Sequence, residues 1–141
     1  MGWADVHLHQ FEVGGRQIGV PGDGGWGEVE DERRVRLSEV APGERARFTY
    51  EYDFGDSWWH QIVVEKVRPA EPGAVYPVCL AGRRAAPPED VGGVWRYGVF
   101  LEAVADPTHP EHDEMIEWIG RAFDPAAFHL EAVNASLRRL R

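Results

Sequence analysis

A strictly alternating aromatic stretch limits the folds open to this chain of 141 residues more than any other segment. Aromatic residues at positions 48, 50, 52 and 54 are separated by polar ones, and β-branched residues follow from Ile62 to Val67 (YEYDFGDSWWHQIVVEKV, residues 50–67). An alternation of period two is typical of a half-buried β-strand. Gly55 lies between the two runs and marks a reversal of the chain. The sequence therefore predicts an antiparallel hairpin near residues 47–67.

The length of the hairpin loop decides which side chains share a face, because a shift of one residue turns a side chain to the opposite face. We expect a loop of two or four residues, which collects most of the large apolar side chains on one side. In that register Asp53 lies opposite Trp58, and Glu51 lies opposite His60. These four residues then share one face of the hairpin. The other face carries Tyr50, Tyr52, Trp59 and Val63.

The segments before this hairpin are predicted to add strands to the same sheet. Residues 6–13 mix apolar and polar positions as a strand does, and residues 16–20 return after a Gly-Gly turn. Strand spacing places His7 and His9 on one face, which metals can use, although an isolated HxH pair is a weak signal. The stretch at residues 21–32 is rich in Gly and then acidic, and is predicted to be a surface loop.

The C-terminal third has helical spacing. We expect helices over residues 97–105, from Pro110, and from Pro125 with Asp124 as its N-cap. Strands followed by a block of helices predict an α+β fold, in which two to three C-terminal helices pack on an antiparallel sheet. The length and the absence of repeats favour a single domain over residues 1–141.

Charge and cysteine content restrict the classes of function. The chain has 24 Asp and Glu against 15 Lys and Arg, a formal net charge of −9. This charge repels phosphate backbones and anionic membranes, so a nucleic-acid partner is not expected and a membrane partner is excluded. Cys79 is the single cysteine, which excludes an internal disulfide framework. With no apolar run near the roughly 20 residues of a membrane span and no signal-peptide pattern, we expect a cytoplasmic location.

Polar residues around the hairpin tip are the first candidates for a functional site. Asp53, Asp56 and His60 place carboxylates beside an imidazole, a combination that binds divalent metals or performs acid–base chemistry. The alternative is that both aspartates hydrogen-bond the backbone of their own turn and His60 is a cross-strand partner. We favour the turn interpretation for Asp56 and leave Asp53 with His60 open. Trp58 and Trp59 point to opposite faces, so one is expected in the core and the other against a ligand or partner.

A second pair of acids lies in the Pro/Gly-rich stretch that follows the hairpin. Glu89 and Asp90 could meet the hairpin residues and complete a metal site of Asp53, His60, Glu89 and Asp90. The alternative is a capped turn at the start of a helix, which is favoured for Asp90 taken alone. A divalent metal ion is therefore a hypothesis. No phosphate-binding glycine motif is present, so nucleotide binding is not supported.

Four segments together resemble the plasmid pRiA4b ORF-3-like family. They are YEYDFGDSWWHQIVVE, PVCLAGRRAAPPEDVGG, YGVFLEAVADPTH and WIGRAFDPAAFHLEAVNASL, in the order that the family has them. Relatives occur on plasmids, as passenger proteins of insertion elements and in prokaryotic chromosomes. The resemblance covers nearly the whole chain and implies an α+β domain, but it brings no biochemical activity.

Two departures from the family pattern affect what the resemblance implies. Family members have a strand pair and a helix before the segment that begins here at Gly2-Trp3, so we expect this chain to lack that N-terminal region. A missing edge strand would expose apolar surface and favour a homodimer. Many relatives carry a cysteine just before PPED, where this chain has Ala86, so a two-cysteine site in that loop is not available.

Three functions remain open from the sequence. The first is a non-catalytic module, associated with plasmids or mobile elements, that binds a protein partner or a small ligand. The second is a metal-dependent hydrolase that uses the cluster of Asp, His and Glu residues. The third is an accessory factor that binds DNA, which the net charge disfavours.

Overall fold

The computed structural model describes residues 2–22 and 29–140. The chain divides into two compact units. The first is Asp5–Pro69, and the second is made of the residues up to Ala4 together with those from Ala70 onward. The single domain over residues 1–141 stays a prediction. Most of the Gly-rich stretch expected to be a loop, residues 23–28, lies outside the described residues.

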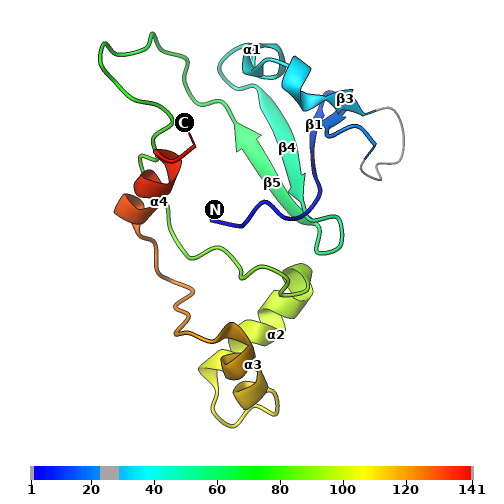
Figure 1. The fold of residues 1–141 in the computed structure, drawn as a ribbon, viewed down its shortest axis with the longest axis vertical. Coiled ribbons are helices and arrows are strands. Elements are labelled where there is room, and N and C mark those ends of the chain that lie inside the picture. The colour runs from blue at the N-terminus through cyan, green and yellow to red at the C-terminus, as the bar shows by residue number, and fades with distance from the viewer. Residues whose placement is uncertain (1, 23–28, 141) are drawn as a thin grey trace. The chain divides into compact units, whose positions relative to one another are not determined.

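The first unit is a five-stranded sheet (Figure 1). Its strands are β1 (His9–Val13), β2 (Arg16–Gly19), β3 (Glu30–Asp31), β4 (Arg47–Tyr52) and β5 (Trp58–Val63). Their order across the sheet is β3-β2-β1-β4-β5. Every neighbouring pair is antiparallel except β2 and β3, which run parallel, so the predicted antiparallel sheet is in fact mixed. With the helices of the second unit, these strands confirm the α+β class.

One face of the sheet is apolar because register and alternation agree across its strands. Phe11 on β1 lies opposite Ile18 on β2 and opposite Tyr50 on β4. Phe48 lies opposite Ile62 on β5, and the ring centroids of Phe11 and Tyr50 are 4.9 Å apart. Cross-strand contacts between aromatic and branched side chains are the main stabilising unit of a sheet. They define the face on which the first unit builds its core.

The hairpin of β4 and β5 is present, but its predicted register is wrong. Tyr52 pairs with Trp58, so the loop spans residues 53–57, an odd number, instead of two or four. Glu51 consequently lies opposite Trp59, and Tyr50 opposite His60. The physical reason is Asp53, which takes a left-handed conformation (φ 58°) and accepts the Ser57 amide on its carbonyl oxygen at 2.6 Å. Asp53 therefore belongs to the turn and not to the ladder.

The shifted register exchanges the roles expected for the two tryptophans. Both lie on β5 and point to opposite faces, as predicted. Trp58 is the buried one, 8% exposed, whereas Trp59 is 54% exposed. In the predicted register Trp59 shared the apolar face with Tyr50 and Tyr52. In the structure Trp58 occupies that face instead.

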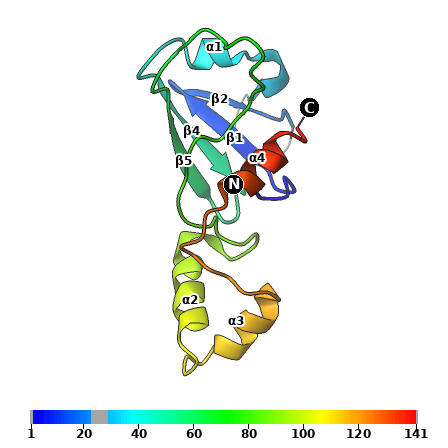
Figure 2. The same ribbon diagram turned by 90° about the vertical axis from the view of Figure 1, so that its left-hand side faces the viewer.

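The second unit contains the three longer helices, α2 (Gly93–Ala105), α3 (His112–Ile119) and α4 (Leu130–Leu137). Figure 2 shows α2 and α3 side by side, and the two helices contact each other. Phe100 on α2 is fully buried, and the rings of Trp118 and Phe123 meet it edge-on at centroid distances of 5.8 and 5.3 Å. This aromatic cluster is the core of the helix pair.

The predicted helix starts differ from the observed ones at three places, the smallest difference being that of α3, which begins at His112 and not at Pro110. The helix α2 begins at Gly93, before the predicted start at residue 97. The last helix begins at Leu130 and not at Pro125. Asp124 does cap a turn, because its carboxylate accepts the Ala126 amide at 2.9 Å. That side-chain bond forms a local turn which competes with a helix, and the chain straightens before α4.

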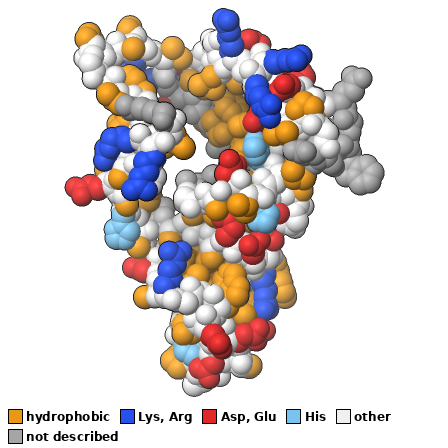
Figure 3. Space-filling model, in the orientation of Figure 1, with side chains coloured by type: hydrophobic (Ala, Val, Ile, Leu, Met, Phe, Trp, Pro, Cys, Tyr) orange, Lys and Arg blue, Asp and Glu red, His pale blue; other side chains and the backbone are white. Residues whose placement is uncertain are grey.

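Surface charge in the second unit is acidic over α3. Asp113, Glu114 and Glu117 are all exposed, and acidic side chains gather over this helix at the lower end of Figure 3. Among the described residues, no helix combines the length and the apolar character needed to cross a bilayer.

Candidate functional site

Asp53 at the hairpin tip hydrogen-bonds the backbone of its own turn, as the alternative interpretation holds, and its side chain also faces a histidine. Its Oδ1 atom accepts the amides of Gly55 and Asp56 at 2.9 and 3.3 Å. Its Oδ2 atom lies 3.8 Å from Nδ1 of His7. His7 precedes β1, so it does not share a strand face with His9 as the spacing suggested. Asp53 is 8% exposed, and a carboxylate this buried needs such partners.

His60 lies on the apolar face beside Tyr50. Its Nδ1 atom is 3.2 Å from the carbonyl oxygen of Tyr50, and the two ring centroids are 5.6 Å apart. The ladder does not place Glu51 opposite His60, so this predicted contact is absent. Trp58 is buried near the same end of β5, and Asp56 lies within the turn. The sharing of a site by Asp53 and His60 stays a prediction.

Glu51 lies on the opposite face and is satisfied within the first unit. It is 6% exposed, with Oε2 accepting the Gln10 amide at 2.7 Å and Oε1 accepting the Ser57 hydroxyl at 3.1 Å. Hydrogen bonds to both carboxylate oxygens offset the desolvation of the buried charge. Glu51 therefore fastens the loop of the hairpin to β1.

The other two predicted acids belong to the second unit. Glu89 accepts the Ala4 amide at 2.9 Å, and Trp3 donates its indole proton to the Pro87 carbonyl at 2.8 Å. Asp90 has a left-handed backbone (φ 58°) in the turn before α2. Glu89 also borders a hollow of about 440 Å³ within the same unit. The four-residue metal site of Asp53, His60, Glu89 and Asp90 stays a prediction.

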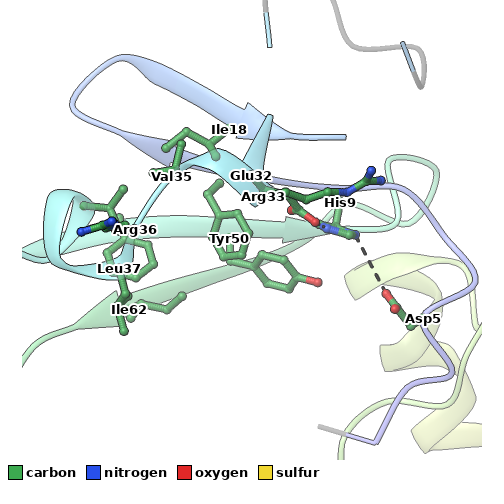
Figure 4. A pocket seen from close by; sticks show the side chains of 13 residues that line it. Asp5, His9, Ile18, Glu32, Arg33, Val35, Arg36, Leu37, Tyr50 and Ile62 are labelled. Atoms are coloured by element: carbon green, nitrogen blue, oxygen red, sulfur yellow. Dashed lines mark hydrogen bonds and ion pairs between the residues drawn. The ribbon is translucent and has the colours of Figure 1, made fainter. Parts of the chain in front are cut away.

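A pocket of about 650 Å³ lies on the apolar face of the sheet (Figure 4). Its floor is formed by side chains of four strands: Phe11, Ile18, Phe48, Tyr50 and Ile62. Its other wall is the segment that follows β3, the 3-10 helix η1 (Glu32–Arg34) and the short helix α1 (Leu37–Val40). Apolar side chains therefore surround most of the space.

Polar groups gather at one end of this pocket. Nε2 of His9 lies 2.9 Å from Oε2 of Glu32, and Nδ1 lies 4.0 Å from a carboxylate oxygen of Asp5. Because a carboxylate only accepts, the short contact requires that Nε2 of His9 donates its proton to Glu32. The bond also ties η1 to β1 across the pocket. Figure 4 shows Asp5, His9 and Glu32 together at this end, and Leu37 with Ile62 at the other.

Tyr50 links the apolar floor to the polar end. Burial is the main cause that raises the pKa of its hydroxyl to about 12, and the carboxylates of Asp5 and Glu32 with the phenol of Tyr52 add to this rise. At neutral pH Tyr50 therefore keeps its proton and can both donate and accept a hydrogen bond. An apolar cavity with a few converging polar groups is the usual form of a ligand site.

The raised pKa of Tyr50 gives a stability change with a defined sign. The folded protein keeps a proton that the unfolded chain releases near pH 10, so stability is expected to fall as pH rises from about 10 to about 12. Absorbance titration of tyrosinate measures the raised pKa of Tyr50 that causes this loss of stability, with Tyr50→Phe as the matched variant. The absorbance change of one tyrosine near pH 12 should be lost in Tyr50→Phe; an unchanged amplitude there would contradict the assignment to Tyr50.

The sequence did not reveal this pocket. His9 was visible only as half of an HxH pair, and Tyr50 only as an aromatic position in a strand. Glu32 and Asp5 carry no local pattern that connects them with either. The pocket exists because residues 32–40 fold over the sheet face, and this contact between distant segments leaves no local pattern in the sequence.

Comparison with known proteins finds relatives that are similar over nearly the whole chain. The chain is 41% identical over 140 residues to "Uncharacterized protein y4hQ" of Sinorhizobium fredii, covering 97% of this chain and 71% of that protein. A crystal structure of a protein of unknown function, MM3350 from Methanosarcina mazei Go1, matches with a TM-score of 0.82 and 38% identity. The match covers 94% of this chain and 75% of the MM3350 chain.

The family model described as "Plasmid pRiA4b ORF-3-like protein" matches residues 1–132. That range holds both the sheet unit with its pocket and most of the helical unit. The sequence resemblance is thus confirmed: the chain belongs to the plasmid pRiA4b ORF-3-like family.

Proposed function

We propose that this protein is a non-catalytic binding module that holds a small ligand in the pocket of its sheet unit. The observation that carries the proposal is the cavity itself. Its volume of about 650 Å³ lies within the range of roughly 300–1,000 Å³ that small-molecule sites occupy. The acidic net charge and the lack of a complete catalytic motif agree with binding in place of catalysis.

The walls of the pocket support this function because they combine a rigid floor with a short cover. Four hydrogen-bonded strands hold the floor side chains, so little ordering is needed when a ligand binds. The cover places Leu37, a side chain 71% exposed to water, at the rim. Burial of such apolar surface by a ligand contributes about 25 cal/mol for each Å² removed from water.

The test is a titration of the isotope-labelled protein with 4-phenylbutanol, followed by NMR. We expect chemical-shift changes at the pocket residues Phe11 and Tyr50. Leu37→Asp introduces a charge at the apolar lining and is expected to weaken binding about tenfold, the equivalent of about 1.4 kcal/mol.

Ser38→Asp is the matched control for this experiment. It adds the same charge to the same helix α1, at an exposed position that does not line the pocket. Its affinity for the probe should equal that of the unmodified protein. Absence of shifts at the pocket, or equal binding by Leu37→Asp, would refute the proposed function.

A metal-dependent hydrolase is the second candidate. The specific observation is the 3.8 Å between Nδ1 of His7 and Oδ2 of Asp53, a histidine and carboxylate pair of the kind that divalent metals use. The ligand set predicted from the sequence, Asp53, His60, Glu89 and Asp90, stays a prediction.

The metal hypothesis is tested by calorimetric titration with Zn²⁺ and Mn²⁺ of protein purified without an affinity tag. One ion should bind per chain, and Asp53→Asn should lose it, because asparagine keeps the Oδ1 acceptor of the turn but lacks the charge. Equal metal affinity of the Asp53→Asn variant would end the hypothesis.

A further inference from the structure

We propose that the pocket selects an organic cation, a ligand with an apolar body and a protonated amine as its head. The inference rests on the proposed ligand-binding function and adds the chemical class of the ligand. The body would lie on the aromatic floor, and the ammonium group would face Asp5, Glu32 and the hydroxyl of Tyr50.

The polar end of the pocket holds two carboxylates, those of Asp5 and Glu32, beside the donor groups of His9 and Arg33. The carboxylates of Asp5 and Glu32 only accept hydrogen bonds, and one oxygen of Glu32 already accepts a hydrogen bond from His9. Nδ1 of His9, at 4.0 Å from the Asp5 carboxylate, is beyond hydrogen-bond length. An ammonium group brings three donors and no acceptor, which complements the two carboxylates.

The electrostatic field at the polar end has the sign that a cation requires. The carboxylates of Asp5 and Glu32 both disfavour ionisation of the Tyr50 phenol, whose charged form is negative. The same field attracts a positive head group at that point. The ring of His9 at this end lies 5.9 Å from that of Tyr50 and 6.3 Å from that of Phe11, centroid to centroid, so aromatic rings that can attract a cation border the polar end.

Two arginines also line the pocket and act against a cation. Arg36 lies beside Leu37, at the opposite end from Asp5 (Figure 4). Arg33 lies near Glu32 and is exposed to solvent, so water screens its charge, and it equally screens that of Asp5, whose side chain is 82% exposed. The carboxylate of Glu32, 28% exposed, is therefore the main anionic group at this end. Removal of the Arg33 charge should therefore strengthen amine binding, and the Arg33→Gln variant serves as a test of opposite sign.

The experiment compares three probes with one body and different heads: 4-phenylbutylamine, 4-phenylbutanol and 5-phenylvalerate. We expect the amine to bind most tightly and the carboxylate most weakly, with a gap of about tenfold or more that narrows as salt is added. The double variant Asp5→Asn/Glu32→Gln should weaken amine binding about tenfold. Arg33→Gln should strengthen amine binding about twofold.

The alcohol probe keeps structural loss apart from loss of charge recognition. The readout is the ratio of amine to alcohol affinity, which Asp5→Asn/Glu32→Gln should lower about tenfold, because glutamine keeps an oxygen that accepts from Nε2 of His9, whereas a loosened pocket would weaken both probes alike. Glu39→Gln, on α1 but outside the lining, is the charge control and should leave all three affinities unchanged. If amine and alcohol bind the pocket equally, cation selectivity is overturned while the ligand-binding function stands. If none of the three probes binds, both are overturned.

Discussion

Replacement of Phe100 by alanine is expected to lower the free energy of unfolding by about 3–5 kcal/mol, the range for deletion of a large buried aromatic side chain. Phe100 is 0% exposed and meets Trp118 and Phe123 edge-on, at centroid distances of 5.8 and 5.3 Å. Alanine would lose these contacts and leave a cavity between α2 and α3. Because the helix pair has no larger buried side chain among its described residues, this substitution should be the most destabilising in the second unit.

Trp95→Ala is the control for this prediction. It removes a larger aromatic side chain from the same helix, at a position that is 81% exposed. Chemical denaturation followed by circular dichroism should show a change within about 0.5 kcal/mol for Trp95→Ala. If the two substitutions cost the same, the core of the helix pair does not lie at Phe100.

Replacement of Asp53 by alanine is expected to cost about 2–3 kcal/mol. Two backbone amides, those of Gly55 and Asp56, would lose their acceptor, at about 1 kcal/mol each. Alanine would also have to adopt the left-handed conformation that Asp53 holds at φ 58°, which adds roughly 1 kcal/mol. The turn should loosen, and Tyr52 and Trp58 should lose part of their pairing.

The Asp53→Asn variant separates the contribution of the turn hydrogen bonds from that of the negative charge. Asparagine tolerates the left-handed region and keeps an Oδ1 acceptor, so the expected cost is below about 1 kcal/mol. Amide hydrogen exchange at Gly55 and Asp56 reads out the two bonds directly. Fast exchange at both positions is expected in Asp53→Ala and not in Asp53→Asn. The reverse order would show that the charge of Asp53 matters more than its turn.

Local patterns predicted most elements of this fold and its two hairpin pairs, but not the register of the β4–β5 hairpin and not β3, which lies in the stretch predicted as a loop. The aromatic alternation located β4 and β5, and helical spacing located α2 and α3, because period and propensity act within a few residues. The register failed at one residue, Asp53, whose side chain takes over a turn that strand alternation assigns to the ladder. The parallel pairing of β3 with β2 could not be predicted either, because the residues Glu30-Asp31 carry no local pattern that indicates a partner strand.

The candidate site shows the same division between local and long-range information. Turn chemistry for Asp53 was foreseen as an alternative because it depends on the next three residues. Its contact with His7, and that of His9 with Glu32, join segments 46 and 23 positions apart in sequence and needed the folded chain. The sequence predicted a site at the tip of the hairpin, whereas the pocket lies on the apolar face of the sheet.

The bond between Trp3 and Pro87 has a consequence for the order of events during synthesis. Its two partners are separated by 84 positions, and at ribosomal rates the second emerges roughly 4 to 17 s after the first. The residues of the sheet unit leave the ribosome within that interval. The sheet can therefore form before the indole of Trp3 reaches its acceptor. Trp3 is thus synthesised early but forms this hydrogen bond late.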